Sequence, residues 1–412
     1  MNIARNVKYV VIIIVILLAI ISLTQGIRNA LRVNFGSFDF QWDAAWFLLN
    51  RQNPYTICLS GQHTWTEQYV GRLWPNQFPS CLILLWPYAV FEWPVAKILW
   101  LVSNLLFTGV ILYIAFKQFL PDRSRLTYLI IASIFIAGTP WRNLIGNGQH
   151  ALFSMAFFLI ALWYAYREKT IVSGVCLAIS LFKYTLIGPL WLFFLYKRQY
   201  KILGIAVGIH TLLHFFSSFW LWESPLKLIR QPLLVSAVLS QKGYLDLTAL
   251  FSNLTSPLAA YMLGGLLLTV TCYIIYHNKT SDLLVLSALS FVSTVIIYHR
   301  GYDYVILLFP LLLIAATPVK SWKTLPLIFC SASIVCTWFI DKLMLVITPI
   351  MESHGVLWIR SLYFVTLVVV WYFTIILLLR SIKQSNQQKG MISSSSVSYP
   401  YGDLDDTTRP CQ

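Results

Sequence analysis

Charged residues are scarce in this sequence, and their scarcity excludes most kinds of protein. They make up 11% of the 412 residues, whereas an ordinary soluble domain has about 25%. Hydrophobic residues make up 58%, and the mean hydropathy is +0.70. A soluble globular enzyme, a disordered chain and a nucleic-acid-binding module are therefore excluded. Apolar runs recur, without the alternation of a membrane β-barrel, and they predict an all-α, polytopic integral membrane protein.

Metal-binding and redox motifs are also lacking. The seven cysteines include no Cys-x-x-Cys pair, and no His and Cys residues have the spacing of a metal site. We therefore expect neither a metal nor another cofactor. Cys58 and Cys81 lie in one polar loop that we place outside the cell. They could form a disulfide there if the compartment is oxidising, and the sequence leaves both states open.

The apolar runs predict about twelve membrane segments, with both termini in the cytoplasm. The first is a signal anchor near Val10–Gln25, and the last is near Leu357–Leu379. Lys183 and then Gly188-Pro189 interrupt the run Ile171–Tyr196, which we interpret as two half-length helices that enter and leave from the cytoplasm. With this broken pair, more than half of the 30 Lys and Arg residues fall in short cytoplasmic loops, as the positive-inside rule requires.

The expected organisation is one membrane domain followed by a tail. Residues 1–380 form the membrane domain, and residues 381–412 have the Gln- and Ser-rich composition of a disordered cytoplasmic tail. Two long polar loops, residues 26–93 and 223–256, are predicted outside, with interfacial helices in the first. Long outer loops and short basic inner loops indicate that the protein works at the outer face of the plasma membrane.

Two carboxylates lie in the first outer loop, beside an amphipathic segment. Aromatic and aliphatic residues recur at helical spacing over Phe38–Leu49, which predicts a helix in the membrane interface. Asp39 and Asp43 are four residues apart, so we expect both carboxylates on one face of that helix. One of them could act as a general base; alternatively, Asp39 only caps the helix. Asn53-Pro54-Tyr55 predicts the helix end.

A second polar segment, Arg142–His150, is expected to join two spans on the outside. Its two glycines permit backbone conformations that other residues resist. The side chains of Arg142, Asn147 and Gln149 offer hydrogen-bond donors to an anionic or hydroxylated ligand. The alternative is an ordinary hairpin turn.

A third feature is Lys183, which interrupts an apolar run at depth. An ionisable residue within a membrane segment is costly unless it has a partner, so it marks a functional site by default. At the tip of the broken pair it would face a cavity, where a phosphate is the expected counter-ion. The alternative is a lysine that extends its charged end to the membrane surface.

The fourth feature is a polar cluster between two short spans. His299, Arg300 and Asp303 bring an imidazole, a guanidinium and a carboxylate together within five residues. They could contact a charged substrate, or they could simply neutralise one another.

In this order and on this topology, the four segments resemble glycosyltransferase family 87. This group of mannosyl- and arabinofuranosyltransferase-like membrane proteins belongs to the GT-C superfamily of polyprenyl-phosphate-sugar-dependent enzymes. The resemblance runs over about residues 10–380. Asp39–Tyr55 matches the family's opening pattern, and Gly148-Gln149 matches its Gly-Gln turn. Leu181–Thr185 corresponds to its Lys-Pro-Thr segment, and His299–Tyr304 corresponds to its late polar loop. Tyr184 is a departure, because the family usually has proline there.

The resemblance implies transfer of a sugar, with inversion, from a polyprenyl phosphate to a lipid or glycan acceptor at the outer face. Asp39 would be the general base, with Asp43 as second candidate. Mannose is the favoured sugar; arabinofuranose and other hexoses stay open. A multi-pass transporter or flippase is the alternative function, because broken helices and buried charge are also transporter features. The residues implied in substrate binding are Arg142, Asn147, Gln149, Lys183, His299, Arg300 and Asp303.

Overall fold

The computed structural model is helical throughout the part of the chain that it describes, which is residues 2–33, 36–60, 75–240, 257–277, 281–296, 301–317 and 338. No strand occurs in these residues, so the predicted all-α class is confirmed. The tail, residues 381–412, lies outside them. The elements are α1 (Asn2–Ala30), α2 (Trp42–Leu49), α3 (Pro54–Leu59), α4 (Pro79–Leu82), η1 (Ile83–Leu85), α5 (Trp86–Ala89), α6 (Trp93–Phe119), α7 (Arg125–Ala137), α8 (Thr139–Asn147), α9 (Ala151–Ala165), α10 (Thr170–Ser180), η2 (Leu181–Lys183), α11 (Tyr184–Tyr196), α12 (Tyr200–Leu221), α13 (Pro225–Ser240), α15 (Pro257–His277), α16 (Asp282–Ile296), η3 (Gly301–Leu307) and α17 (Leu308–Ala316).

Four of these helical stretches are long and apolar enough to cross a membrane, or five if a bent pair counts as one span. They are 9–30, 93–119, 170–196 and 200–221, and the bent pair is 125–147. Shorter apolar helices, such as α9 and α16, accompany them. The expected span Leu357–Leu379 lies outside the described residues, and the count of about twelve segments stays a prediction.

Residues 170–196 fold back on themselves as a helical hairpin. A straight helix of 27 residues would hold its ends about 40 Å apart. Instead, both ends meet at the side chain of Asp282. The Tyr166 hydroxyl, just before α10, donates to Asp282 Oδ2 at 2.7 Å, and Lys197 Nζ, just after α11, lies 3.1 Å from Asp282 Oδ1. The chain therefore reverses between α10 and α11.

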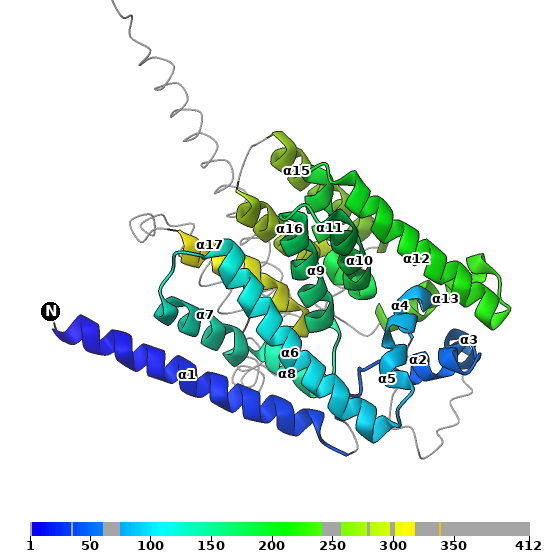
Figure 1. Ribbon diagram of the computed structural model, residues 1–412, viewed down its shortest axis with the longest axis horizontal. Helices are drawn as coiled ribbons and strands as arrows, with labels where there is room; N and C mark the ends of the chain where they lie inside the picture. Colours follow the sequence, from blue (N-terminus) through cyan, green and yellow to red (C-terminus); the bar gives the residue numbers. More distant parts are fainter. Residues whose placement is uncertain are drawn as a thin grey trace, which may run out of the picture.

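The start of α12 supports the same reversal. Gly174 of α10 packs against Ile205, five residues into α12, and the Ala178 carbonyl accepts a hydrogen bond from His210 at 2.7 Å. Since both helices advance together, α10 and α12 run parallel and α11 runs against them. The predicted break is present as a hairpin with η2 at its tip (Figure 1), and the side of the membrane on which the hairpin opens stays a prediction.

A bend of 58° separates α7 from α8. We predicted that Arg142–His150 joins two spans, with an ordinary hairpin turn as the alternative; the hairpin turn is wrong for most of this segment, because α8 continues to Asn147. Pro140 lies in the first turn of α8, where proline is compatible with a helix. The helix is also amphipathic, with Trp141, Leu144 and Ile145 buried and Arg142, Asn143 and Asn147 half-exposed. The real turn is at Gly148.

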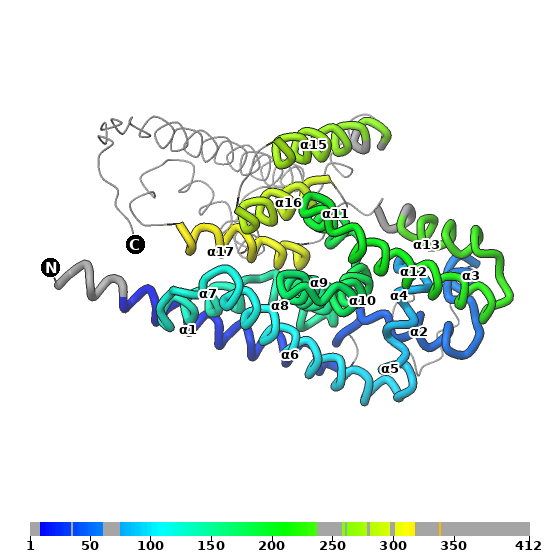
Figure 2. The backbone as a smooth tube through the Cα atoms, turned by 45° about the horizontal axis from the view of Figure 1, so that its top comes forward, coloured from blue at the N-terminus to red at the C-terminus, as the bar shows by residue number. Residues whose placement is uncertain are grey.

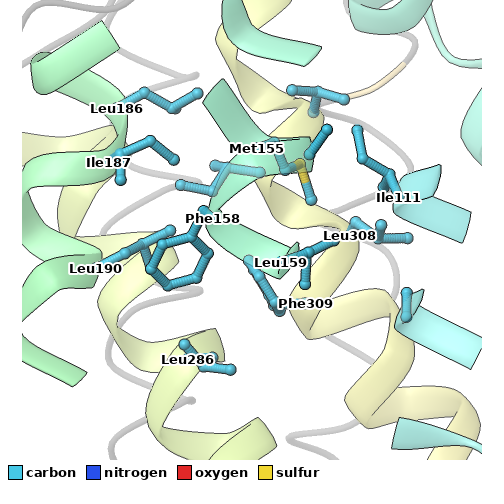
Figure 3. Packing of buried hydrophobic residues seen from close by; sticks show 14 of the residues in the cluster. Ile111, Met155, Phe158, Leu159, Leu186, Ile187, Leu190, Leu286, Leu308 and Phe309 are labelled. Carbon is cyan, nitrogen blue, oxygen red and sulfur yellow. The ribbon is translucent and has the colours of Figure 1, made fainter. Parts of the chain in front are cut away.

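The main apolar core surrounds α9. Figure 3 shows Met155, Phe158 and Leu159 of α9 between side chains of α6, α11, α16 and α17. In Figures 1 and 2, α1 runs along one edge of this bundle, where it packs on α7 and α8. The side of α1 away from the bundle exposes Ile13, Leu17 and Ile20, as expected for a helix that faces lipid.

A second region, which we call the lobe, lies at the far end of α6 from the α17 side (Figures 1 and 2). It consists of α2 to α5 together with the end of α12 and with α13. Two smaller apolar clusters hold it together, one around Phe40 and Trp100 and one around Tyr55 and Leu228. The lobe thus joins the described parts of both long polar loops.

The helix predicted over Phe38–Leu49 begins only at Trp42. Asp39 lies in the preceding turn, so our prediction that Asp39 and Asp43 share a helix face is wrong. The alternative that Asp39 caps the helix is also wrong, because the N-cap residue is Gln41, whose side chain makes no capping bond. The helix does end before Asn53-Pro54-Tyr55, as predicted. The Asn53 side chain then caps α3 by accepting from the amides of Tyr55 and Thr56.

Cys58 and Cys81 do not form the disulfide that the sequence left open. Both are free thiols, and both are buried. The Cys81 thiol contacts the Leu181 carbonyl at 3.7 Å, which links α4 to the hairpin tip. Burial raises the pKa of Cys58 to about 11, so its thiol is protonated near neutral pH.

Candidate active site

Lys183 is buried at the tip of the helical hairpin. The backbone changes from η2 to α11 at this residue, whose φ and ψ are −107° and 73°. The Lys183 amide donates to the Ser154 hydroxyl of α9 at 3.0 Å, which fixes the tip against the core. Only 7% of Lys183 is exposed. The alternative in which this lysine extends to the surface is therefore wrong.

The Lys183 ammonium has partners from two distant parts of the chain. It forms an ion pair with Asp303 of η3 and contacts Gln149 Oε1 at 3.4 Å. It also lies 4.8 Å from the centroid of the Tyr302 ring, within the range of a cation–π interaction. The Gln149 amide donates to the Tyr302 hydroxyl at 2.8 Å. We call these four residues the Lys183 cluster.

The turn that carries Asp39 is bound to the same corner of the molecule. The Asp39 amide donates to the Asn147 carbonyl at 2.9 Å, and the Gln41 amide donates to His150 Nε2 at 3.4 Å. Gln149 lies between these two contact points in the sequence. The turn and the Lys183 cluster therefore both contact one short segment, residues 147–150. The Asp39 side chain is half-buried there.

Gly148 makes this close approach possible. Its φ is +68°, in the left-handed region that favours glycine. A Cβ added at this position would lie 2.8 Å from the Ser37 Cβ and 3.2 Å from the Phe40 Cβ. The Gly148 carbonyl accepts a hydrogen bond from the Trp100 indole at 2.8 Å. The Gly-Gln dipeptide thus lets the first long loop pack directly onto the start of α9.

His150 is a residue that the sequence did not single out. Its ring stacks on Phe182 at 4.4 Å between centroids, next to Lys183 in the chain. Burial, and then the charge of Lys183, hold the pKa of His150 well below its usual value. The neutral ring can accept the Gln41 amide, which supports the Asp39 turn. The only signal in the sequence was its place next to Gln149.

Asp43 lies in the first turn of α2 and is 91% buried, since its exposed fraction is 9%. Burial raises the pKa of Asp43 to about 7. Within the described residues, no hydrogen bond or ion pair to its carboxylate is found. A buried carboxyl group of this kind is unusual unless it serves a function.

The other predicted site residues are placed less tightly. Arg142 Nη1 donates to Gln25 Oε1 of α1 at 3.2 Å, so its guanidinium is engaged outside the Lys183 cluster. Asn147 contributes its backbone carbonyl, and its side chain is half-buried. His299 and Arg300 lie outside the described residues.

The counter-ion of Lys183 in this structure is Asp303, and a phosphate at this lysine stays a prediction. The part of the chain that the structure describes holds no group of three or more His, Cys, Asp or Glu residues that could bind a metal ion. The groups that this corner offers include the carboxylates of Asp39 and Asp303, the Lys183 ammonium and the Gln149 amide.

A buried cation and nearby carboxylates within an apolar helical bundle define a membrane protein that handles a polar or charged substrate. A family model for glycosyltransferase family 87 matches residues 79–349, more than half of the chain. The chain therefore belongs to glycosyltransferase family 87 and is a membrane glycosyltransferase. No curated protein and no solved structure matches it.

The matched region is narrower than the resemblance over about residues 10–380. It includes α8, the hairpin and η3, and hence the whole Lys183 cluster. It begins after Asp39 and Asp43, so the roles of these two carboxylates rest on the motif and on their placement.

Proposed function

We propose that this enzyme transfers a sugar, with mannose as first candidate, from a polyprenyl monophosphate to a lipid or glycan acceptor. Transfer takes place at the outer face of the membrane and inverts the anomeric carbon. The observation that carries the proposal is the placement of Asp39 beside the corner that holds Lys183, 144 residues further along the chain. A base and a buried cation are the two groups that this reaction needs.

The base assists the attack of the acceptor. Asp39 takes the proton of the acceptor hydroxyl while that oxygen forms its bond to the anomeric carbon. The bond from the anomeric carbon to the phosphate oxygen breaks on the opposite side. The products are the glycosylated acceptor and a polyprenyl monophosphate. Asp43 is the second candidate for the base, because its carboxyl is buried in the same loop and its pKa is raised to about 7.

The cation assists the departure of the phosphate. The donor phosphate carries one negative charge as a diester and gains another when the sugar leaves. Lys183 lies in a buried site, where a charge interaction is stronger than in water. Lys183 therefore stabilises the leaving group, and Gln149 supplies an amide beside it.

Sugar transfer by purified enzyme from a radiolabelled polyprenyl-phosphate sugar tests this proposal. We expect Asp39→Asn to lower the rate by about 10²–10⁴-fold without loss of the fold, because general-base catalysis contributes about that much. Asp122→Asn is the matched control, since Asp122 is exposed in the turn between α6 and α7. If Asp39→Asn retains full activity and Asp43→Asn does not, the base is Asp43. If both variants retain it, the base lies elsewhere.

The sugar is identified by the same assay with different donors. We expect polyprenyl-phosphate mannose to be the best donor, with the arabinofuranose and glucose donors as comparisons. Mass spectrometry of glycolipids from cells with and without the enzyme then identifies the acceptor. A product that retains the anomeric configuration of the donor contradicts the inverting mechanism.

A further inference from the structure

The Lys183 ammonium already has three partners nearby. They are the Asp303 carboxylate, Gln149 Oε1 and the face of the Tyr302 ring. An ammonium group has only three donors. A phosphate can therefore reach Lys183 only if one of these partners moves.

Asp303 is the partner that conflicts with a phosphate. Its carboxylate and a phosphate carry charge of the same sign, and both would lie beside one ammonium in a buried site with weak dielectric screening. Gln149 and Tyr302 are neutral and could stay in place. Because the Asp303 carboxylate and the phosphate repel each other, Asp303 is the partner that must move away from the ammonium.

The backbone at Asp303 suits such a movement. Asp303 lies in η3, a 3-10 helix of seven residues that leads into α17. Runs of 3-10 helix longer than three or four residues are uncommon, because their hydrogen bonds have poor geometry, and they often mark a hinge. The hairpin tip on the other side is fixed by the bond from the Lys183 amide to Ser154. With the backbone of Lys183 held at the tip, the movement that separates the pair is that of the Asp303 carboxylate.

We propose that Asp303 is a positioning residue that holds Lys183 in the empty site and gives it up when a phosphate binds. The inference rests on the proposed function, in which Lys183 receives the phosphate of the lipid donor. The carboxylate and the phosphate are alternative counter-ions of one buried cation. The ion pair keeps the lysine directed to the site, at the expense of some affinity for phosphate.

Phosphate binding by the purified full-length enzyme in detergent tests this inference without any sugar transfer. The probes are a polyprenyl monophosphate and, separately, inorganic phosphate. We expect Asp303→Asn to bind the polyprenyl monophosphate about tenfold more tightly, because a carboxylate no longer competes with the phosphate for the ammonium; tenfold corresponds to about 1.4 kcal/mol. Unchanged or weaker binding by the folded variant would overturn the inference.

The matched control is Asp282→Asn. Asp282 pairs with Lys197 at the opposite end of the same hairpin, so this variant also removes the carboxylate partner of a hairpin lysine. We expect its phosphate affinity to equal that of the wild type. An equal gain in both variants would show a general effect of net charge and would overturn the assignment to Asp303.

Gln149→Glu keeps the test decisive if Asp303→Asn does not fold. It places a second carboxylate beside the ammonium, 3.4 Å from Nζ in the present geometry, and the new side chain can accept from the Tyr302 hydroxyl. We expect phosphate binding to weaken about tenfold. Unaltered binding in this folded variant would also overturn the inference.

The two probes separate the sources of the phosphate. The expected pattern is tighter binding in Asp303→Asn, unchanged binding in Asp282→Asn and weaker binding in Gln149→Glu. If only the polyprenyl monophosphate follows this pattern, the site recognises a lipid headgroup. If inorganic phosphate follows it too, the phosphate group alone suffices. If phosphate binding follows the pattern and the wild type transfers no sugar from any polyprenyl-phosphate donor, the proposed function fails and the exchange of counter-ions stands. If transfer occurs and the pattern is absent, only the exchange fails.

Discussion

The core around α9 and the lobe differ in the hydrogen bonds that their buried polar groups make. In the core, hydroxyl groups bond to backbone carbonyls of their own or a neighbouring helix. Ser287 of α16 donates four residues back, and Ser293 donates to the Leu186 carbonyl of α11. In the lobe, polar side chains bond between segments. The Asn53 amide donates to Glu223 and to Gln231, and the Trp220 indole donates to the Leu48 carbonyl.

The difference follows from helix length. A long apolar helix satisfies its own backbone and needs only packing from its neighbours, whereas the short helices of the lobe leave many end groups for side chains to satisfy. The Lys183–Asp303 pair stands out against this background, because it is a charged contact between segments inside the core. The other polar contacts named here in the core join neutral groups, so the charge of this pair is what marks the site.

The largest expected effect is at this ion pair. We expect Lys183→Met to destabilise the enzyme by about 3–5 kcal/mol, because it leaves the buried Asp303 carboxylate without that lysine. The double variant Lys183→Met/Asp303→Leu should recover most of that loss, since apolar residues can replace a buried pair. Thermal unfolding in detergent measures both. Ser290→Ala, which removes a bond within α16, is the control, with an expected loss below about 1.5 kcal/mol. An equal loss in the single variant and the control would contradict the contrast.

The next effect concerns Asp43 in the lobe and depends on pH. Its pKa is raised from 3.8 to about 7 in the folded state, so the folded enzyme keeps a proton that the unfolded chain has lost between these values. The folding free energy of the wild type should therefore become less favourable as pH rises through this window, by at most about 1.4 kcal/mol per pH unit.

Asp43→Asn should remove this dependence. We expect the variant to match the wild type near pH 4 and to be more stable by about 2 kcal/mol or more at pH 8, since the wild type must then ionise a buried group. Denaturation of both proteins at the two pH values measures the difference. A gain in stability together with a loss of sugar transfer would indicate that the carboxyl serves function. Equal pH profiles would contradict the raised pKa.

A smaller effect is expected at the link between the two long loops. Asn53→Ala removes the cap of α3 and two amide contacts to the region of α13. We expect a loss of about 1–2 kcal/mol, with faster hydrogen exchange in α13 than in α9. Gln231→Ala, which removes one of those contacts and leaves the cap, should have a smaller effect. Exchange that rises equally in α13 and α9 would argue against a separate lobe.

The smallest effect is expected at the ion pair Lys197–Asp282. The Lys197 side chain is 35% exposed and the Asp282 side chain 25%, so water screens their interaction. We expect Lys197→Met to cost less than about 1 kcal/mol in the same unfolding assay. A loss as large as that of Lys183→Met would show that burial does not set the difference between the two pairs.

Several local features could be predicted because they depend on nearby residues. The fold-back at Lys183 followed from the sign and spacing of charges, since only a reversal keeps Lys197 with the other cytoplasmic cations. Asn53-Pro54 marked a helix boundary for the same local reason. The prediction failed at Asp39 and in α8, where packing of the first long loop moved the helix boundaries by several residues.

The partners of the buried groups could not be predicted. Asp303 was assigned to its own polar loop, and the structure pairs it with a lysine 120 residues away. Arg142 was expected to face a ligand, and it binds Gln25 of the first helix. Such contacts depend on how distant helices pack, which no local pattern records.

The all-helical membrane class and the reversal at Lys183 are consequences of hydrophobicity and charge, which act on each segment separately. The meeting of Lys183, Gln149 and Asp303 beside the Asp39 turn is a consequence of tertiary packing. A lysine in an apolar segment needs a partner, and this requirement could be inferred from the sequence. Only the fold decides which carboxylate meets it, because hydrogen-bond distances between remote segments depend on the position of every helix in between.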